Sequence, residues 1–182
     1  MWNKGVEEYF RAAEQVKLVR QNGTSPEFVL IGGANAVNDT GVEAVWLSNP
    51  LTIPSDWLER EAARGYVQWM PHQDDMLPHI RAADVVVLPS YYPEGVPRSL
   101  LEAMGCGAAI ITTDTPGCRE VVEPGKNGYL VRPRDADDLA RAMLEMVDHP
   151  DQVRRMGEAS RRMVVERFSD DRVKLRSMVV NA

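Results

Sequence analysis

The sequence predicts an α/β domain in which helices cover both faces of a parallel sheet. Short continuous apolar runs such as Phe28–Ile31 and Val85–Leu88 are typical of strands that are buried on both faces. Amphipathic segments with helical periodicity alternate with these runs, which is the pattern of parallel α/β folds. No repeat or linker interrupts the 182 residues, so we expect a single domain over residues 1–182.

The first elements are predicted to be a helix and a strand. Apolar residues recur every three or four positions over Val6–Arg20, and Asn22-Gly23 then provides a helix stop and a turn. The strand Phe28–Ile31 runs directly into Gly32-Gly33. A long polar stretch follows it, over Ala34–Pro54.

The middle of the chain continues the alternation. Ser55 is expected to cap a helix that runs to about Arg64, and a strand follows at Tyr66–Met70. A short helix over Met76–Ala82 then precedes the strand Val85–Leu88. Ligands of such sheets bind at the carboxyl ends of the strands, so the loops that follow them are the places to look for a site.

The second half has the same organisation. Pro97 is expected to open a helix that ends near Gly105, since proline is favoured in a first helical turn. A strand at Ala108–Thr113, a short helix at Arg119–Val122 and a last strand at Gly128–Val131 follow. The remainder is expected to be helical, over Ala136–Val147, Pro150–Phe168 and Asp170–Val180.

Composition excludes several classes of protein. The formal net charge of −6 argues against a nucleic-acid-binding protein. The two cysteines, Cys106 and Cys118, are too few for a disulfide scaffold and favour a reduced, cytoplasmic setting. The apolar runs are too short to span a bilayer, and acidic residues interrupt the start of the chain where a signal peptide would be apolar.

The loop after Val85–Leu88 holds the strongest chemical signal. Two glutamates lie eight positions apart, Glu94 in a turn and Glu102 on the helix that starts at Pro97. The free amides and the dipole of a helix start form an anion site, and a carboxylate can accept hydrogen bonds from sugar hydroxyls. Apolar neighbours suggest that Glu102 is buried and therefore needs a donor. The alternative, left open by periodicity, is that Glu94 is a turn residue and Glu102 a solvated one.

The segments PSYYPEGVPRSLLEAMGCG (89–107) and AAIITTDTPGCREVVEPGKNGYLV (108–131) carry a resemblance to a known family. They resemble the donor-binding C-terminal domain of family 4 retaining glycosyltransferases of the GT-B architecture, and most of all the branch that acts on undecaprenyl-diphosphate-linked sugars. The likeness runs from Lys4-Gly5 to about Phe168. It implies a Rossmann-like fold and transfer of a hexose or N-acetylhexosamine, with retention, from a nucleotide sugar that is expected to be UDP-linked.

The resemblance also implies roles for individual residues. Glu94 would face the donor sugar, and Lys4 would neutralise the leaving diphosphate; these two are the expected catalytic residues. Glu102 would accept hydrogen bonds from the ribose. The other expected contacts are the helix start (Gly95, Val96, Pro97, Arg98), the turn beside the phosphates (Gly32, Gly33) and the strand end that flanks the base (Trp69, Met70).

The family needs no metal, so no metal or other cofactor is expected. The expected partners are the nucleotide-sugar donor, a lipid-linked or saccharide acceptor in surface polysaccharide or glycan biosynthesis, and an N-terminal acceptor-binding domain that the resemblance implies and this sequence lacks. For that reason we expect the 182 residues alone to bind donor without turnover. Contact of the intact enzyme with a membrane surface, and self-association through the last helix, are left open.

The family also has a strand ending in Gly-Arg before the Lys-Gly pair, whereas Met1-Trp2-Asn3 precedes Lys4 here. That strand would lie between Phe28–Ile31 and Val85–Leu88. Three outcomes are open: the two strands pair directly, a partner chain donates a strand, or further residues precede Met1. The last is favoured, and direct pairing of the two strands would contradict the topology.

Two other functions remain open at this point. The chain could be a non-catalytic nucleotide-sugar binding module, or half of a UDP-sugar epimerase of the same architecture. A dinucleotide-dependent oxidoreductase is disfavoured, because no GxGxxG follows the first strand. His72, His79 and Asp74-Asp75 are better explained as surface or capping residues than as ligands. For Arg119 a sugar contact and a structural ion pair are both left open.

Overall fold

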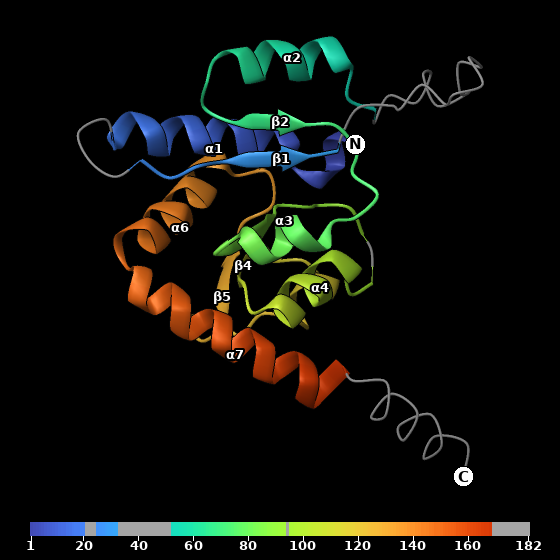
Figure 1. The fold of residues 1–182 in the computed structure, drawn as a ribbon, viewed down its shortest axis with the longest axis vertical. Helices are drawn as coiled ribbons and strands as arrows, with labels where there is room; N and C mark the ends of the chain where they lie inside the picture. Colours follow the sequence, from blue (N-terminus) through green and yellow to red (C-terminus); the bar gives the residue numbers. More distant parts are fainter. Residues whose placement is uncertain (21–24, 33–51, 94, 169–182) are drawn as a thin grey trace, which may run out of the picture.

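The computed structural model describes residues 1–20, 25–32, 52–93 and 95–168. Parallel strands alternate with helices along the chain, as predicted (Figure 1). A short 3-10 helix, η1 (Trp2–Lys4), leads into the first α-helix. The α-helices are α1 (Val6–Val19), α2 (Ser55–Ala63), α3 (Leu77–Ala82), α4 (Arg98–Cys106), α5 (Pro116–Arg119), α6 (Ala136–Asp148) and α7 (Pro150–Phe168).

The strands form two parallel sheets. β1 (Val29–Ile31) pairs with β2 (Gln68–Met70), and β3 (Val85–Leu88), β4 (Ala109–Thr113) and β5 (Gly128–Val131) form the second sheet in that order. β1 and β3 do not pair with each other. Direct pairing of these two strands, which would have contradicted the predicted topology, is therefore not found in the described residues. In these residues β1 and β3 each keep one unpaired edge.

Helices cover both faces of the larger sheet, because side chains along a strand alternate between its faces. Ala109 and Ile111 of β4 belong to a core cluster with residues of α1 and α6, whereas Ile110 belongs to a second cluster with residues of α4 and α7. β4 is buried along its whole length. The central strand thus separates two apolar cores, as expected for a parallel α/β fold.

The helix η1 connects the two sheets. On one side the ring of Trp2 packs edge-on against Trp57 of α2, with 4.7 Å between the ring centroids. On the other side the carbonyl oxygen of Asn3 accepts a hydrogen bond from the backbone N–H of Tyr91, in the loop that follows β3. The short helix η1 therefore contacts both the α2 helix beside the β1–β2 sheet and the loop at the carboxyl end of β3.

Some predicted boundaries were wrong. The helix expected at Arg119–Val122 instead spans Pro116–Arg119, because a proline in the first turn already has helical φ. Ser55 is the first helical residue rather than the cap, and α4 begins one residue after Pro97, which is its N-cap. The helix expected at Asp170–Val180 lies outside the described residues. Of the helices that are described, none is long and apolar enough to cross a membrane.

Candidate functional site

The candidate site lies where the parallel strands end. The arrowheads of β1 and β2 in Figure 1 point toward the end of the molecule where the N-terminus lies. The loop after β3 carries the segment that leads into α4, and its Tyr91 N–H donates to the carbonyl oxygen of Asn3 near the N-terminus. This edge is where α/β sheets bind ligands.

Two threonines of β4 fix the start of the loop after β3. The hydroxyl of Thr112 donates to the carbonyl oxygen of Leu88 at 2.7 Å, and the hydroxyl of Thr113 donates to that of Ser90. Both threonines are buried. Since hydrogen bonds away from water are costly to break, the path of the chain from Leu88 to Ser90 is well determined.

The Lys4-Gly5 pair lies directly against this loop, although the two segments are more than 80 positions apart in the sequence. The N–H of Tyr91 donates to the carbonyl oxygen of Asn3 at 3.0 Å, and the hydroxyl of Ser90 donates to the same oxygen at 3.4 Å. Gly5 has a φ of 76°, and a Cβ built on it would lie 2.1 Å from the carbonyl oxygen of Pro89. Only glycine fits this close approach.

Lys4 is partly buried, and its ammonium lies over an aromatic ring of the same loop. Its Nζ is 5.4 Å from the centroid of Tyr92, whose side chain remains exposed. A cation over an aromatic face is attracted by the quadrupole of the ring. The structure therefore brings Lys4 beside the loop that carries the predicted sugar-binding motif.

The start of α4 provides the predicted helix terminus. Pro97 is its N-cap, and the Pro97 carbonyl oxygen accepts hydrogen bonds from the N–H groups of Leu100 and Leu101. The N–H groups of the first turn of an α-helix have no partner within the helix, so they can bind an anion. Gly95 is exposed and Val96 partly buried just before this turn. Glu94 lies outside the described residues.

The expectation that Glu102 is buried is wrong. Its side chain is 53% exposed, and Oε1 lies 4.0 Å from Nη2 of Arg98 one helical turn earlier. The apolar residues of α4 that are fully buried, Leu100, Ala103 and Met104, lie on another face of the helix. The carboxylate of Glu102 is thus accessible from solvent, and its role as the ribose acceptor stays a prediction.

The predicted base-flanking residues form a second group, at the ends of β1 and β2. The N–H of Gly32 donates to the carbonyl oxygen of Met70 at 2.9 Å, and Nε1 of Trp69 donates to the carbonyl oxygen of Gly32 at 2.8 Å. Trp69 and Met70 are partly buried. Trp69 and Met70 therefore lie beside Gly32, while Gly33 lies outside the described residues. The expected contacts of these residues with the base and the phosphates stay predictions.

Sequence reasoning missed Tyr91 and Arg134. The guanidinium carbon of Arg134 lies 4.5 Å from the ring centroid of Tyr91, and Arg134 has a φ of 59°. Burial and the nearby carboxylate of Glu8 raise the pKa of the Tyr91 phenol, and the charge of Arg134 opposes them. The signal available in the sequence was the Arg-Pro-Arg run (132–134), which directly follows the carboxyl end of β5.

Several polar residues have structural partners within the protein, as the explanations without a ligand predicted. The carboxylate of Asp75 accepts from the N–H of Leu77 at the start of α3, and Arg119 pairs with Asp114. Arginines on α7 also have structural partners. Arg154 and Arg162 pair with acidic residues on the same helix, and Arg161 donates to the carbonyl oxygen of Gly105.

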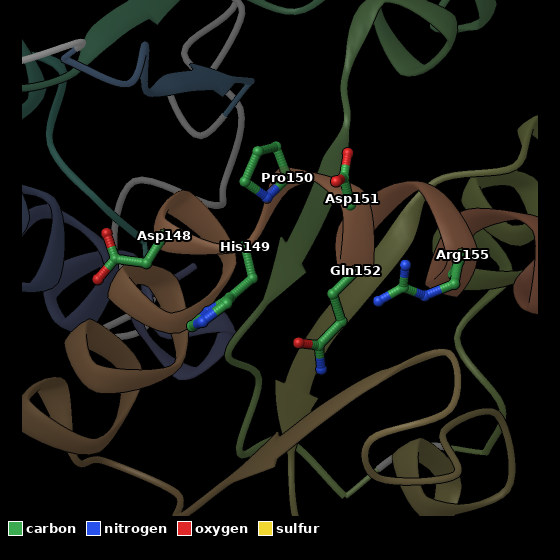
Figure 2. Close-up of a pocket in the computed structure, with 6 residues that line it drawn as sticks. All are labelled: Asp148, His149, Pro150, Asp151, Gln152 and Arg155. Atoms are coloured by element: carbon green, nitrogen blue, oxygen red, sulfur yellow. The ribbon is translucent and has the colours of Figure 1, made fainter.

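A cavity of about 300 Å³ lies elsewhere, where α6 meets α7 (Figure 2). Its lining residues are Asp148, His149, Pro150, Asp151, Gln152 and Arg155. Gln152 donates to the hydroxyl of Tyr129, near the amino end of β5, so the cavity is at the opposite edge from the candidate site. Nδ1 of His149 lies 2.9 Å from the carbonyl oxygen of Glu145, within hydrogen-bonding distance. We assign no function to this cavity.

Comparison with known proteins gives a consistent picture. Residues 1–149 match the family model "Glycosyl transferases group 1". Over 140 residues the chain is 31% identical to the N,N'-diacetylbacillosaminyl-diphospho-undecaprenol alpha-1,3-N-acetylgalactosaminyltransferase of Campylobacter jejuni, covering 77% of this chain and 31% of that protein. This chain therefore spans about a third of the length of that relative.

Solved structures share the fold. Sucrose-phosphate synthase from Thermosynechococcus elongatus superposes with a TM-score of 0.76 at 25% identity, over 100% of this chain and 42% of that one. The HepE protein of Anabaena, solved in complex with UDP, gives a TM-score of 0.75 at 20% identity, over 100% of this chain and 46% of that one.

Proposed function

Because the chain belongs to the glycosyl transferases group 1 family, we propose that it is the donor-binding half of a retaining glycosyltransferase. The proposed donor is a UDP-sugar, with UDP-N-acetylhexosamine favoured, and the proposed acceptor is a lipid-linked saccharide. The placement of Lys4-Gly5 against the loop that leads into α4 carries this proposal.

The charges at this edge suit a diphosphate. The ammonium of Lys4 lies over Tyr92, near the start of the loop over residues 89–98, and the N–H groups at the start of α4 lie at the end of that loop. A pyrophosphate group carries negative charge that both kinds of group attract. The carboxylate of Glu102, in the second turn of the same helix, is accessible for hydroxyl groups of the bound nucleotide.

Relatives support the choice of donor and acceptor. The name of the Campylobacter jejuni relative describes transfer of N-acetylgalactosamine to a diphospho-undecaprenol-linked sugar. The HepE structure contains UDP, which supports a uridine nucleotide in this fold. Holding one donor beside an acceptor is the contribution that we propose for the chain within a larger enzyme.

The two glutamates of the motif should differ in role. Glu102→Ala is expected to weaken binding of UDP itself by about 1–3 kcal/mol, as for a lost hydrogen bond to a charged group. Glu94→Ala should leave UDP binding nearly unchanged and remove the extra affinity that the sugar of UDP-N-acetylglucosamine confers. Calorimetric titration of both variants with both ligands measures the difference. Equal losses of UDP affinity would contradict the assignment, and no UDP binding by the wild-type chain would contradict the proposed function.

Nucleotide binding should not depend on a divalent metal. Lys4 and the amides of the α4 start are proposed to neutralise the diphosphate, whereas Mg²⁺ would require carboxylate and water ligands. UDP titrations in EDTA and in magnesium chloride are expected to give the same Kd within about twofold, or about 0.4 kcal/mol. Loss of binding in EDTA that magnesium restores would show that the phosphate site is elsewhere.

A further inference from the structure

We propose that Arg134 is a positioning residue for the donor-binding site, which it holds in place through the neighbouring tyrosines Tyr91 and Tyr92. This inference rests on the proposed function, because the site that Arg134 positions is the UDP site built around Lys4. Arg134 itself follows β5, whereas the tyrosines follow β3 and Lys4 precedes α1.

The backbone of Arg134 first marks the residue as unusual. Its φ of 59° lies in the left-handed region, where it is the one described residue other than glycine. A side chain in this conformation crowds the following carbonyl group, which costs free energy that glycine would avoid. Strain of this kind persists where the surrounding structure holds it, and it is often found at functional sites.

The side chain of Arg134 also makes an unusual contact. Its guanidinium lies 4.5 Å from the centroid of the Tyr91 ring. Arg132, two residues earlier, instead pairs with Asp135 and Asp138. Arg134 has no ion pair with any residue that the structure describes, so its contact with the Tyr91 ring is what distinguishes it from its neighbour.

Tyr91 transmits this contact to the start of the chain. Its backbone N–H donates to the carbonyl oxygen of Asn3 at 3.0 Å, directly before Lys4. The next residue, Tyr92, lies under the ammonium of Lys4 at 5.4 Å. Two adjacent tyrosines therefore each have a cation against the ring, one from the β5 loop and one from the proposed diphosphate site.

This arrangement gives Arg134 a defined effect. If Tyr91 were free to swing away, its N–H bond to Asn3 and the ring beneath Lys4 would both lose their fixed position. Small displacements of groups that hold a ligand weaken binding, because the lost order must be restored when the ligand binds. Arg134 thus acts on the ligand only through the tyrosines.

Arg134→Gly tests this proposal, since it removes the guanidinium and also relieves the backbone strain. The melting temperature should stay the same or rise, because glycine adopts the left-handed conformation readily. Hydrogen exchange of the Tyr91 amide, followed by NMR in the full chain, should nevertheless become about fivefold faster or more. The Kd for UDP is expected to rise about threefold to tenfold.

Three further variants serve as controls. Arg155→Ala removes an exposed arginine at the opposite edge of the sheet and should change neither readout. Tyr91→Leu should reproduce the effects of Arg134→Gly, while Tyr91→Phe keeps the ring and should resemble the wild type. In the Tyr91→Leu background, Arg134→Gly should have no further effect on the Kd, as expected for residues that act through one contact.

The two readouts separate this proposal from the proposed function. Unchanged exchange of the Tyr91 amide in Arg134→Gly would overturn the positioning role whether or not UDP binds. Faster exchange with an unchanged Kd for UDP would overturn it as well, since the loop would then move without consequence for the ligand. Failure of the wild-type chain to bind UDP, with faster Tyr91 exchange in the variant, would instead contradict the UDP site and leave the tyrosine contact established.

Discussion

Gly5→Ala is expected to lower the free energy of unfolding by about 3 kcal/mol and to weaken UDP binding at the same time. A methyl group at this position would lie 2.1 Å from the carbonyl oxygen of Pro89 and 2.7 Å from its carbon, both of them backbone atoms. The segments must therefore separate, which costs more than the conformational penalty of about 1 kcal/mol for a side chain at positive φ. Urea unfolding and calorimetric titration with UDP measure the two effects.

Gly65→Ala is the matched control for this prediction. Gly65 has a φ of 80°, close to the 76° of Gly5, but a Cβ built there meets no atom within 4 Å. Its replacement should cost about 1 kcal/mol from backbone strain alone and should not change the affinity for UDP. Equal destabilisation by the two substitutions would mean that the approach of Lys4-Gly5 to Pro89 is looser than the structure indicates.

The strands were largely predictable from the sequence, because a strand buried on both faces requires a continuous apolar run. Val85–Leu88 and Gly128–Val131 were predicted with the bounds that the structure gives. The helix α7 was also predicted correctly, since proline and a long amphipathic pattern define its start and extent. The short helix α5 was misplaced, because four residues are too few to show periodicity.

The exposure of Glu102 was not predictable from its immediate neighbours. Apolar residues on both sides of it in the sequence suggested burial, but adjacent helical positions point about 100° apart and do not share a face. The pattern of buried residues on α4 shows an apolar face that leaves out Glu102. Reading the helix by three- and four-residue steps, rather than by adjacency, would have placed the carboxylate at the surface.

The contact between Arg134 and Tyr91 could not be predicted for another reason. It joins residues 43 positions apart whose meeting depends on the relative placement of the loops after β3 and β5. It also depends on the left-handed backbone conformation of Arg134, which cannot be predicted from the sequence because this conformation is uncommon for residues other than glycine. By contrast, the meeting of Lys4 with the motif loop was expected from the family resemblance, and the structure places the two segments together.

The short helix η1 connects this site with both sheets. Trp2 contacts the helix that precedes β2, Asn3 bonds to the loop that follows β3, and Lys4 lies between these anchors and α1. A change in the distance between β1 and β3 would therefore be transmitted to the ammonium of Lys4. For this reason we expect substitutions that loosen η1 to affect ligand affinity as well as stability.

Lys4→Met is expected to have the largest effect on ligand binding, raising the Kd for UDP by about tenfold to hundredfold. This corresponds to about 1.4–2.7 kcal/mol, which is the size expected for a lost hydrogen bond between charged groups. Methionine keeps much of the aliphatic length of lysine but removes the ammonium that lies over the Tyr92 ring. The free energy of unfolding should fall by no more than about 1 kcal/mol, which is what a cation over an exposed aromatic ring contributes.

Titration with uridine separates the phosphate from the base in this prediction. Uridine lacks the diphosphate, so its weak affinity should be the same for the wild type and Lys4→Met. Lys126→Met provides the control for charge, because Lys126 is exposed and pairs with Glu123 in the turn before β5. It should bind UDP as tightly as the wild type. Equal losses for UDP and uridine would mean that Lys4 supports the fold of the site rather than the diphosphate, and equal losses in both lysine variants would reduce the effect to net charge.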